Sequence, residues 1–243
     1  MAKVLLVTGA SRGIGAATAR LAARRGWAVG VNYAGREDAA RAVCEAIRAE
    51  GGDAVPLGAD VSDEGQVRAL FRACEAALGP VSGLVNNAGI LGPAAPLGAI
   101  AAPRWRRIWA VNVEGTFLCC REALSRLGTG GAIVNLSSMA ATLGGGGEFL
   151  DYAASKGAVE SFTLGLAQEV GPRGIRVNAV RPGLIETDMQ AASGDPNRAR
   201  RLADTVALRR PGTAEEVAQA VVWLVSEEAS YVTGAVLPVS GGR

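Results

Sequence analysis

The feature that most constrains the fold of this chain is a regular alternation of short apolar runs with longer helix-forming stretches. The apolar runs predict strands at residues 3–7, 27–32, 54–57, 84–85, 131–136, 176–180 and 235–239. The stretches between them predict helices at residues 14–25, 37–50, 64–78, 104–126, 152–170 and 213–225. Alternating strands and helices build a parallel sheet with right-handed crossovers. The sequence therefore predicts an α/β fold of three layers, a doubly wound parallel sheet covered by helices on both faces.

The pattern indicates a single domain. No linker, internal repeat or shift in composition divides the 243 residues, so we expect one domain over residues 1–243. Its last long helix should begin at a capping box formed by Thr213 and Glu216. Residues 186–208 are polar and lose their period at Gly194-Asp195-Pro196, which indicates a mobile loop with short helices.

Composition narrows the class of protein. The net charge is +2 and no basic run occurs, so a nucleic-acid partner is not expected. No apolar stretch is long enough to span a membrane, and residues 1–7 are too short for a signal-peptide core. The four cysteines have neither CxxC nor zinc-ligand spacing, so we expect reduced thiols, no metal site and a cytoplasmic location.

A glycine-rich turn joins the first predicted strand to the first predicted helix. Its sequence, Thr8-Gly9-Ala10-Ser11-Arg12-Gly13-Ile14-Gly15, has the spacing TGxxxGxG. Glycines let the backbone approach a pyrophosphate, and the helix start offers free N–H groups and a positive dipole end. A tight connection without a ligand is the alternative. At the first turn of a doubly wound pattern, we favour dinucleotide binding.

A residue at the end of the second strand should contact the adenosine ribose of a bound dinucleotide. A carboxylate there favours NAD, but this chain has Asn32 and Tyr33, followed by Arg36. With Arg12 in the glycine turn, two guanidiniums and no carboxylate suit a 2′-phosphate. The sequence therefore favours NADP(H), with NAD(H) possible. The alternative is that Arg36 is a solvated charge beside a helix start.

Polar residues also follow the third and fourth strands. Asp60-Val61 places a carboxylate where the adenine amino group would lie, although a helix cap near Ser62-Asp63 is the alternative. Asn86-Asn87-Ala88-Gly89 lies at the carboxyl edge of the sheet, where open α/β folds bind ligands. Consecutive asparagines also occur in simple turns.

Tyr152 and Lys156 are the candidate proton-transfer pair. They lie four residues apart in a predicted helix, so their side chains share one face. A neighbouring ammonium favours phenolate and lowers the pKa of a tyrosine. The chain has no histidine, and Lys156 is one of only two lysines among 25 basic residues. A chance pairing on a helix is the alternative.

Together these motifs resemble the classical short-chain dehydrogenase/reductase family over essentially the whole chain. The matching segments are TGASRGIG (8–15), DV (60–61), NNAG (86–89), VNVEG (111–115), IVNLSS (133–138), YAASK (152–156) and RPGLIETDM (181–189). The resemblance implies a Rossmann fold and hydride transfer between a nicotinamide and a carbonyl or secondary alcohol. The subgroups that look nearest are 3-oxoacyl-thioester reductases and sugar or alcohol dehydrogenases.

The resemblance also implies roles for individual residues. Tyr152 matches the acid/base, and Lys156 the residue that lowers its pKa and holds the nicotinamide ribose. Ser138 matches the residue that hydrogen-bonds the substrate oxygen, and Asn112 the one that holds a water for proton relay. The nicotinamide side of the pocket is matched by Pro182, Gly183, Ile185 and Thr187. Ser138 and Tyr152 are separated by one residue more than in the commonest family pattern, a difference that the intervening glycine run can absorb as a loop.

Other readings stay open at this point. A non-catalytic dinucleotide sensor or scaffold would be free to lose Tyr152 or Lys156, and both are present. An epimerase or dehydratase that retains its nucleotide usually has a larger carboxyl-terminal substrate part. The resemblance implies a homotetramer, with a homodimer as the alternative, and residues 186–208 match the variable substrate loop. The expected partner is a small carbonyl or alcohol compound.

Overall fold

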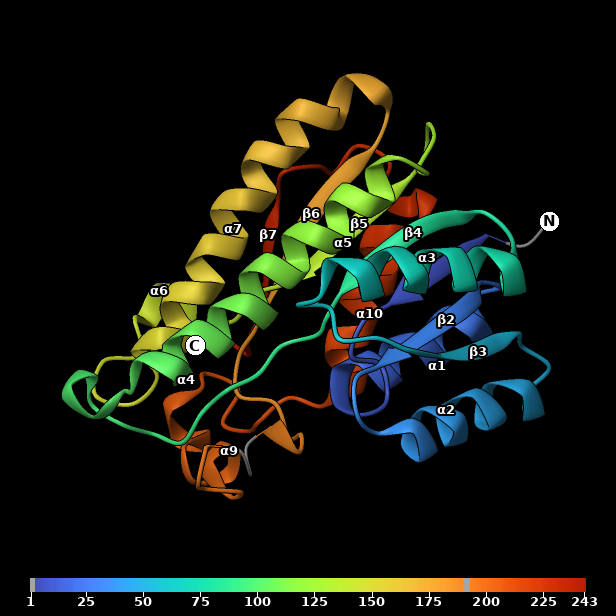
Figure 1. Cartoon of the computed structure of the whole chain (residues 1–243). Helices are drawn as coiled ribbons and strands as arrows, with labels where there is room; N and C mark the ends of the chain where they lie inside the picture. The colour runs from blue at the N-terminus through green and yellow to red at the C-terminus, as the bar shows by residue number, and fades with distance from the viewer. Residues whose placement is uncertain (1–2, 190–192) are drawn as a thin grey trace.

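The protein is built on a seven-stranded parallel sheet (Figure 1). A computed structural model describes residues 3–189 and 193–243. The strands are β1 (Val4–Val7), β2 (Ala28–Tyr33), β3 (Ala54–Gly58), β4 (Val81–Asn86), β5 (Ala132–Leu136), β6 (Arg176–Pro182) and β7 (Val236–Val239). Their order in the sheet is β3-β2-β1-β4-β5-β6-β7, so the chain winds outward in both directions from the β1–β4 pair. This order confirms the predicted doubly wound α/β fold.

Helices cover both faces of the sheet. The helices of at least eight residues are α1 (Gly13–Arg24), α2 (Glu37–Ala49), α3 (Glu64–Leu78), α4 (Ala102–Trp109), α5 (Gly115–Leu124), α7 (Leu150–Val170) and α10 (Ala214–Val225). Helices α1, α2 and α10 pack on one face, and α3, α5 and α7 on the other (Figure 1). Among the residues that the structure describes, no helix is both long and apolar enough to cross a bilayer.

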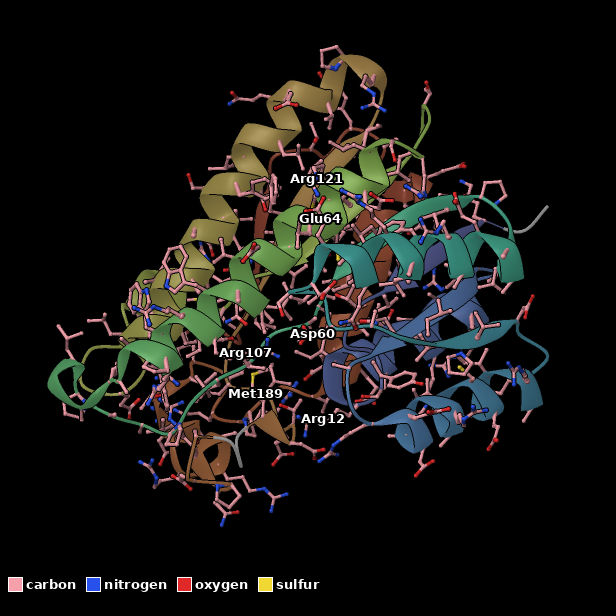
Figure 2. All side chains as sticks on the ribbon, viewed as in Figure 1. Arg12, Asp60, Glu64, Arg107, Arg121 and Met189 are labelled. Atoms are coloured by element: carbon pink, nitrogen blue, oxygen red, sulfur yellow. The ribbon has the colours of Figure 1, made fainter. Side chains whose placement is uncertain are left out.

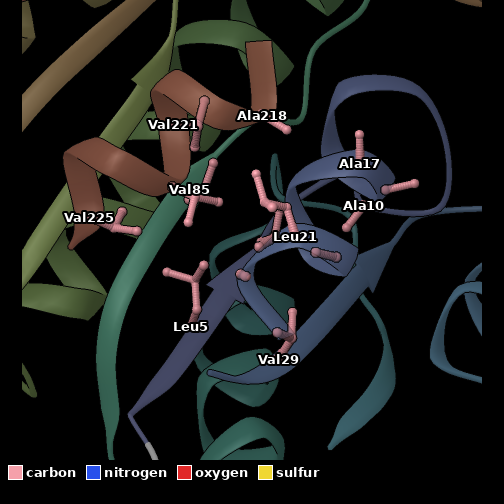
Figure 3. Packing of buried hydrophobic residues seen from close by; sticks show 14 of the residues in the cluster. Leu5, Ala10, Ala17, Leu21, Val29, Val85, Ala218, Val221 and Val225 are labelled. Atoms are coloured by element: carbon pink, nitrogen blue, oxygen red, sulfur yellow. The ribbon is translucent and has the colours of Figure 1, made fainter. Parts of the chain in front are cut away.

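Alternate residues of the central strand serve the two faces. Leu5 and Val7 belong to the core under α1 and α10, whereas Val4 and Leu6 belong to the core under α3 and α5. Successive side chains of a strand point to opposite faces, so a strand covered on both sides must be apolar throughout. Figure 3 shows the first core, where Leu5 and Val85 from the sheet meet Leu21 of α1.

One predicted helix begins where its capping box indicates, and another is divided into three parts. The capping box is confirmed, since Thr213 Oγ1 accepts from the Glu216 backbone N–H and the Glu216 carboxylate accepts from the Thr213 N–H. The single helix expected at 104–126 is instead α4, a π-helical turn η2 (Ala110–Glu114) and α5. A π turn is a rare single turn between α-helical segments, and the apolar pattern of this stretch predicts a helix without distinguishing the two forms.

Two further segments differ from the sequence expectation. The fourth strand begins at Val81, three residues before the predicted run, and a short helix α6 (Ala140–Leu143) precedes the glycine run. As expected, the described part of segment 186–208 contains short helices, namely α9 (Arg198–Arg201) and a 3-10 turn at Ala203–Thr205. Residues 190–192 of that segment lie outside the described residues.

A buried ion pair fixes the start of α7. Arg104 of α4 donates from Nε and Nη2 to the two carboxylate oxygens of Asp151, at 2.7 and 3.1 Å. The Asp151 side chain is fully buried and also accepts from the Tyr152 backbone N–H at 2.9 Å. Arg104 further donates to the Pro93 carbonyl oxygen. The pair therefore joins the loop after β4 to the helix turn that carries Tyr152.

Replacing Arg104 with methionine should destabilise the protein by about 3–5 kcal/mol, because Asp151 would stay buried without its countercharge. Chemical denaturation measures the change in the free energy of unfolding. Arg106→Met is the matched control, since Arg106 lies two residues along the same helix and is exposed. Equal stability of the two variants would show that the Arg104–Asp151 pair does not hold the helix.

Candidate functional site

A long cleft runs along the carboxyl edge of the sheet. It has two adjoining parts, cavities of about 380 and 270 Å³. The smaller cavity lies over the glycine turn and the ends of β2 and β3, and the larger over the ends of β5 and β6. Both are lined by Ile14, Asn87, Gly89, Thr187 and Met189. The shared lining makes them one site for a ligand longer than either part.

The glycine turn forms a cradle that side chains would fill. Gly9 has φ +60°, and a Cβ there would lie 2.8 Å from the Ala88 Cα. A Cβ on Gly15 would lie 2.5 Å from both Asn87 Nδ2 and the Gly9 oxygen. No side chain caps the start of α1. Its first N–H groups are therefore available to an anion, with the positive end of the helix dipole behind them.

Two guanidiniums stand at the end of the smaller cavity. Arg12 and Arg36 both line it, and both approach the same oxygen of Asp188, at 3.5 and 3.9 Å. All three side chains are about half exposed or more. Asp188 was not foreseen from the sequence. Its carboxylate weakly pairs with the two guanidiniums that the sequence analysis assigned to a 2′-phosphate.

Asp60 lies in the smaller cavity but is more tightly held than the sequence suggests. Its Oδ1 accepts from the Ser62 N–H and hydroxyl, and its Oδ2 accepts from Arg107 at 2.9 Å (Figure 2). These bonds lower the pKa of the Asp60 carboxyl against the effect of its burial. The helix cap is a different residue, since Asp63 accepts from the Gln66 N–H at the start of α3. Arg107, which also lines the cavity, carries no sequence signal of its own.

Two predicted cofactor residues lie outside both cavities because strand neighbours point to opposite faces. Tyr33 does not line the cleft and lies near Glu37, whereas Asn32 lines it. Asn86 points into the core and donates to Asn135 Oδ1 at 2.9 Å. Its neighbour Asn87 lines both cavities. Tyr33 and Asn86 thus do not line the cleft, and their roles in cofactor binding stay predictions.

Asn32 and Asn87 hold the cradle in shape. Asn32 Oδ1 accepts from the Gly9 N–H at 3.2 Å, and its Nδ2 donates to the carbonyl oxygens of Leu57 and Ala59. Asn87 Nδ2 donates to the Thr8 and Gly9 carbonyl oxygens, both at 2.9 Å. With their amides engaged, these residues act on a ligand chiefly through the backbone that they position.

The larger cavity contains Ser138, Tyr152 and Lys156. Tyr152 and Lys156 share one face of α7, and the Ser138 hydroxyl lies close enough to Tyr152 to lower the pKa of its phenol. Lys156 Nζ lies 5.7 Å from the centre of the Tyr152 ring and donates to the Leu136 carbonyl oxygen at 2.7 Å. Ser137 is directed elsewhere, since its hydroxyl donates to Glu160. The three side chains thus come together from β5 and α7.

Burial dominates the protonation of this group. It raises the pKa of the Tyr152 phenol, against the lowering effect of the Ser138 hydroxyl. It also lowers the pKa of Lys156 to about 8. In the chain by itself the pKa of Tyr152 is raised, and the lowering expected from Lys156 beside a bound nucleotide stays a prediction. The ammonium is engaged by Leu136, and the dry surroundings disfavour phenolate.

Asn112 lies in the π turn η2, fully buried and outside both cavities. Its Oδ1 accepts from the Ile90 N–H, and its Nδ2 donates to the Ile90 oxygen and to Ser155 Oγ. Each polar position of the side-chain amide is therefore used. A Cβ on Gly89 would meet both Asn112 Oδ1 and Lys156 Nζ within 3.4 Å. The residue joins the end of β4 to α7 directly behind Lys156.

The segment after β6 supplies the remaining wall. Four residues predicted for it line the larger cavity: Pro182, Gly183, Ile185 and Thr187. Residues of this segment that sequence reasoning missed include Leu184, Met189 and Arg198, and Glu148 before α7 was missed as well. Of the other predicted cofactor residues, those that line the smaller cavity are Gly9, Ser11, Arg12, Gly13, Ile14, Asn32, Arg36, Asp60, Val61, Ala88 and Gly89. Gly15 lies just beneath this wall.

The residues present fit a phosphorylated dinucleotide. The uncapped start of α1, the Gly9 and Gly15 cradle and the paired Arg12 and Arg36 together provide for three negatively charged groups. The cleft continues from these groups to Tyr152. The nucleotide would therefore extend from the smaller cavity to the acid/base pair.

Comparison with known proteins agrees with this site. A family model described as enoyl-(acyl carrier protein) reductase matches residues 9–243. The chain is 51% identical over 245 residues to the uncharacterized oxidoreductase YgfF of Escherichia coli, covering 99% of each chain. It is 38% identical to the 3-oxoacyl-[acyl-carrier-protein] reductase FabG of Staphylococcus aureus, covering 100% of this chain and 98% of that one.

A solved structure is similarly close. It is a short-chain dehydrogenase from Burkholderia cenocepacia in complex with NADP, with a TM-score of 0.93 and 37% identity. The match covers 99% of this chain and 97% of that one. The chain therefore belongs to the classical short-chain dehydrogenase/reductase family, and it is an NADP(H)-dependent oxidoreductase that transfers hydride between a nicotinamide and a carbonyl or alcohol carbon.

Proposed function

We propose that this enzyme interconverts a small carbonyl compound and its secondary alcohol, with Tyr152 as the acid/base. The observation that carries the proposal is the meeting of Ser138, Tyr152 and Lys156 in one cavity, with Ser138 close enough to Tyr152 to act on the pKa of its phenol. A sensor or scaffold would not need this buried set. An epimerase or dehydratase that retains its nucleotide would usually have a larger substrate part than this one-sheet fold.

The protonation of Tyr152 suits the reducing direction. Because burial raises its pKa, the phenol carries its proton at neutral pH. Bound NADPH supplies the hydride when a carbonyl compound is present. Ser138 and Tyr152 then donate hydrogen bonds to the substrate oxygen as negative charge grows on it, and Tyr152 gives up its proton.

Proton return would pass through the residues behind Tyr152. Lys156 lies one helical turn along and carries a proton below its pKa of about 8. For Asn112 we keep the water-relay role, through its main-chain carbonyl oxygen, because the side-chain amide is engaged. That oxygen already accepts from Thr116 Oγ1, and a carbonyl has a second lone pair.

The size and lining of the larger cavity support a small carbonyl or alcohol substrate. A volume of about 380 Å³ suits a compact compound, and much of the wall is apolar through Leu91, Leu143 and Leu184. Residues 186–208 are proposed as the substrate loop of the single domain, since Thr187, Met189 and Arg198 line the cavity. A 3-oxoacyl thioester and a sugar or simple alcohol both remain within this class.

We also propose a homotetramer, or a homodimer, in the cytoplasm. Two large apolar side chains, Phe117 on α5 and Leu164 on α7, are exposed on the outer helical layer, where a second copy would cover them. The four cysteines are free and buried, which suits a reducing compartment. Sedimentation equilibrium of the purified chain gives the number of copies.

Replacing Tyr152 with phenylalanine should lower kcat for carbonyl reduction by about 10³-fold or more, because the proton donor is removed. NADPH binding, followed by fluorescence titration, should change little. The assay is NADPH consumption across a panel of aldehydes, ketones and 3-oxoacyl thioesters.

The control removes the hydroxyl of a different tyrosine. Tyr231 is fully exposed, so Tyr231→Phe should keep the activity of the natural chain. Substantial turnover by Tyr152→Phe, with the alcohol as product, would refute the acid/base assignment.

The pH dependence of kcat/KM should follow the protonation of Lys156. Its ammonium is charged below a pKa of about 8 and neutral above it, so kcat/KM for reduction should be flat below that pH. Above it, kcat/KM should fall by about tenfold per pH unit. Measurement with saturating NADPH separates this effect from cofactor binding. A flat profile to about pH 9.5 would mean that the lysine proton is not required.

Replacing Arg36 with glutamine should weaken NADPH binding by about tenfold or more and leave NADH binding within about twofold, because only NADPH has the 2′-phosphate. Asp188→Asn should act in the opposite sense, since it removes the carboxylate that competes for the two guanidiniums. Calorimetric titration gives both dissociation constants.

The matched control is Arg41→Gln in the same region of α2, where the arginine pairs with Glu37 and does not line the cleft. An equal loss of NADPH and NADH affinity in Arg36→Gln would contradict the 2′-phosphate role.

A further inference from the structure

The wall of the larger cavity carries charged side chains that hydride transfer does not use. They come from three separate segments: Glu148 before α7, Arg198 in α9, and Arg243 after β7. All three line the cavity that holds Tyr152 and Lys156. Glu148 is 44% exposed, whereas the Arg198 side chain is only 15% exposed, so Arg198 is the charge of this cluster that is costly to bury.

Arg198 is held in place but is not saturated. Its Nη2 donates to Glu148 Oε2 at 2.6 Å, and its guanidinium carbon lies 5.1 Å from the centre of the Phe149 ring. The side chain is only 15% exposed. Its Nε is buried and has no hydrogen-bond partner among the described residues. An arginine that served only as a brace would have its buried donors satisfied.

The cluster also has more positive than negative side-chain charge. Arg243 lies close enough to Arg198 and Glu148 for both to affect it, since its pKa is lowered by burial and by Arg198 and raised by Glu148. No ion pair of its guanidinium is found in the described part of the chain. Arg198 is the guanidinium that pairs with Glu148, and Arg243 lies near both residues. An added anion would accept a hydrogen bond from the free Nε of Arg198.

The cluster lies close to the reacting group along the chain. Phe149, on whose ring Arg198 rests, precedes Tyr152 by three residues at the start of α7. Arg198, Phe149 and Tyr152 line the same cavity of about 380 Å³. A compact molecule can place its carbonyl at Tyr152 and a second group at Arg198.

We propose that Arg198, assisted by Arg243, selects carbonyl substrates that carry a carboxylate several bonds from the reacting carbon. Glu148 orients Arg198 and competes with that carboxylate. The inference rests on the proposed function, because it assigns the far end of the same substrate. It makes Arg198 a specificity residue and narrows the substrate class to oxo acids and the corresponding hydroxy acids.

The test compares 4-oxocyclohexanecarboxylate with its methyl ester. The two probes have the same carbonyl and the same rigid ring, and they differ by one negative charge. The natural chain should have a KM for the acid that is about tenfold or more below that for the ester. Calorimetric titration of the NADP⁺-saturated enzyme with each probe gives the same comparison without turnover.

Two variants should change the affinity for the acid in opposite directions. Arg198→Gln should raise the KM and dissociation constant of the acid by about 10- to 100-fold and leave the ester within about twofold. Glu148→Gln should tighten binding of the acid, because it removes the competing carboxylate. Arg200→Gln is the control, since Arg200 lies in the same helix, pairs with Glu186 and does not line the cavity.

Several results would overturn the inference. If both variants weaken acid and ester alike, the Glu148–Arg198 pair only supports the cavity wall. If the natural chain reduces both probes with equal KM, the carboxylate is not recognised, although carbonyl reduction stands. If no carbonyl compound is reduced, the proposed function fails, and the calorimetric difference between acid and ester still decides whether Arg198 binds a carboxylate.

Discussion

The parallel direction of all seven strands is the constraint on which the rest of the structure depends. In such a sheet every strand ends at the same edge, so the segments after β1, β4, β5 and β6 meet there although they are far apart in the chain. The order reverses between β1 and β4, which opens the cleft at that edge. Asn87 fixes the meeting point, because its amide joins the end of β4 to the glycine turn after β1.

Burial then sets the chemistry that the cleft can perform. Lys156 is a buried cation whose ammonium has the Leu136 carbonyl oxygen as its acceptor, so it gives up its proton more readily than an exposed lysine. Tyr152 is buried beside it and keeps its proton for the same reason, since dry surroundings disfavour any charged form. The free chain is thus prepared as a proton donor. The opposite role requires further positive charge near the phenol.

The same reasoning separates the two ends of the cleft. At the nucleotide end, Arg12 and Arg36 are exposed and weakly paired with Asp188, so an anion can replace the carboxylate at small cost. At the substrate end, Arg198 is nearly buried, stacked on Phe149 and closely paired with Glu148. A buried guanidinium with an unused donor discriminates more strongly between charged and neutral ligands than an exposed one.

The sequence by itself determined the strand–helix alternation, the glycine turn, the capping box at Thr213 and the pairing of Tyr152 with Lys156. These features depend on neighbours within one or two turns, where apolar period and residue type are sufficient. Only the tertiary structure decided that Asn87 rather than Asn86 faces the cleft, and that Tyr33 does not line it. Successive side chains of a strand point to opposite faces, and the sequence around these polar positions does not show which of two neighbours points to the cleft. The π turn at Asn112, the Asp188 carboxylate between two arginines and the unfilled donor of Arg198 were likewise beyond the sequence. Each depends on contacts between segments that come close together only in the folded structure.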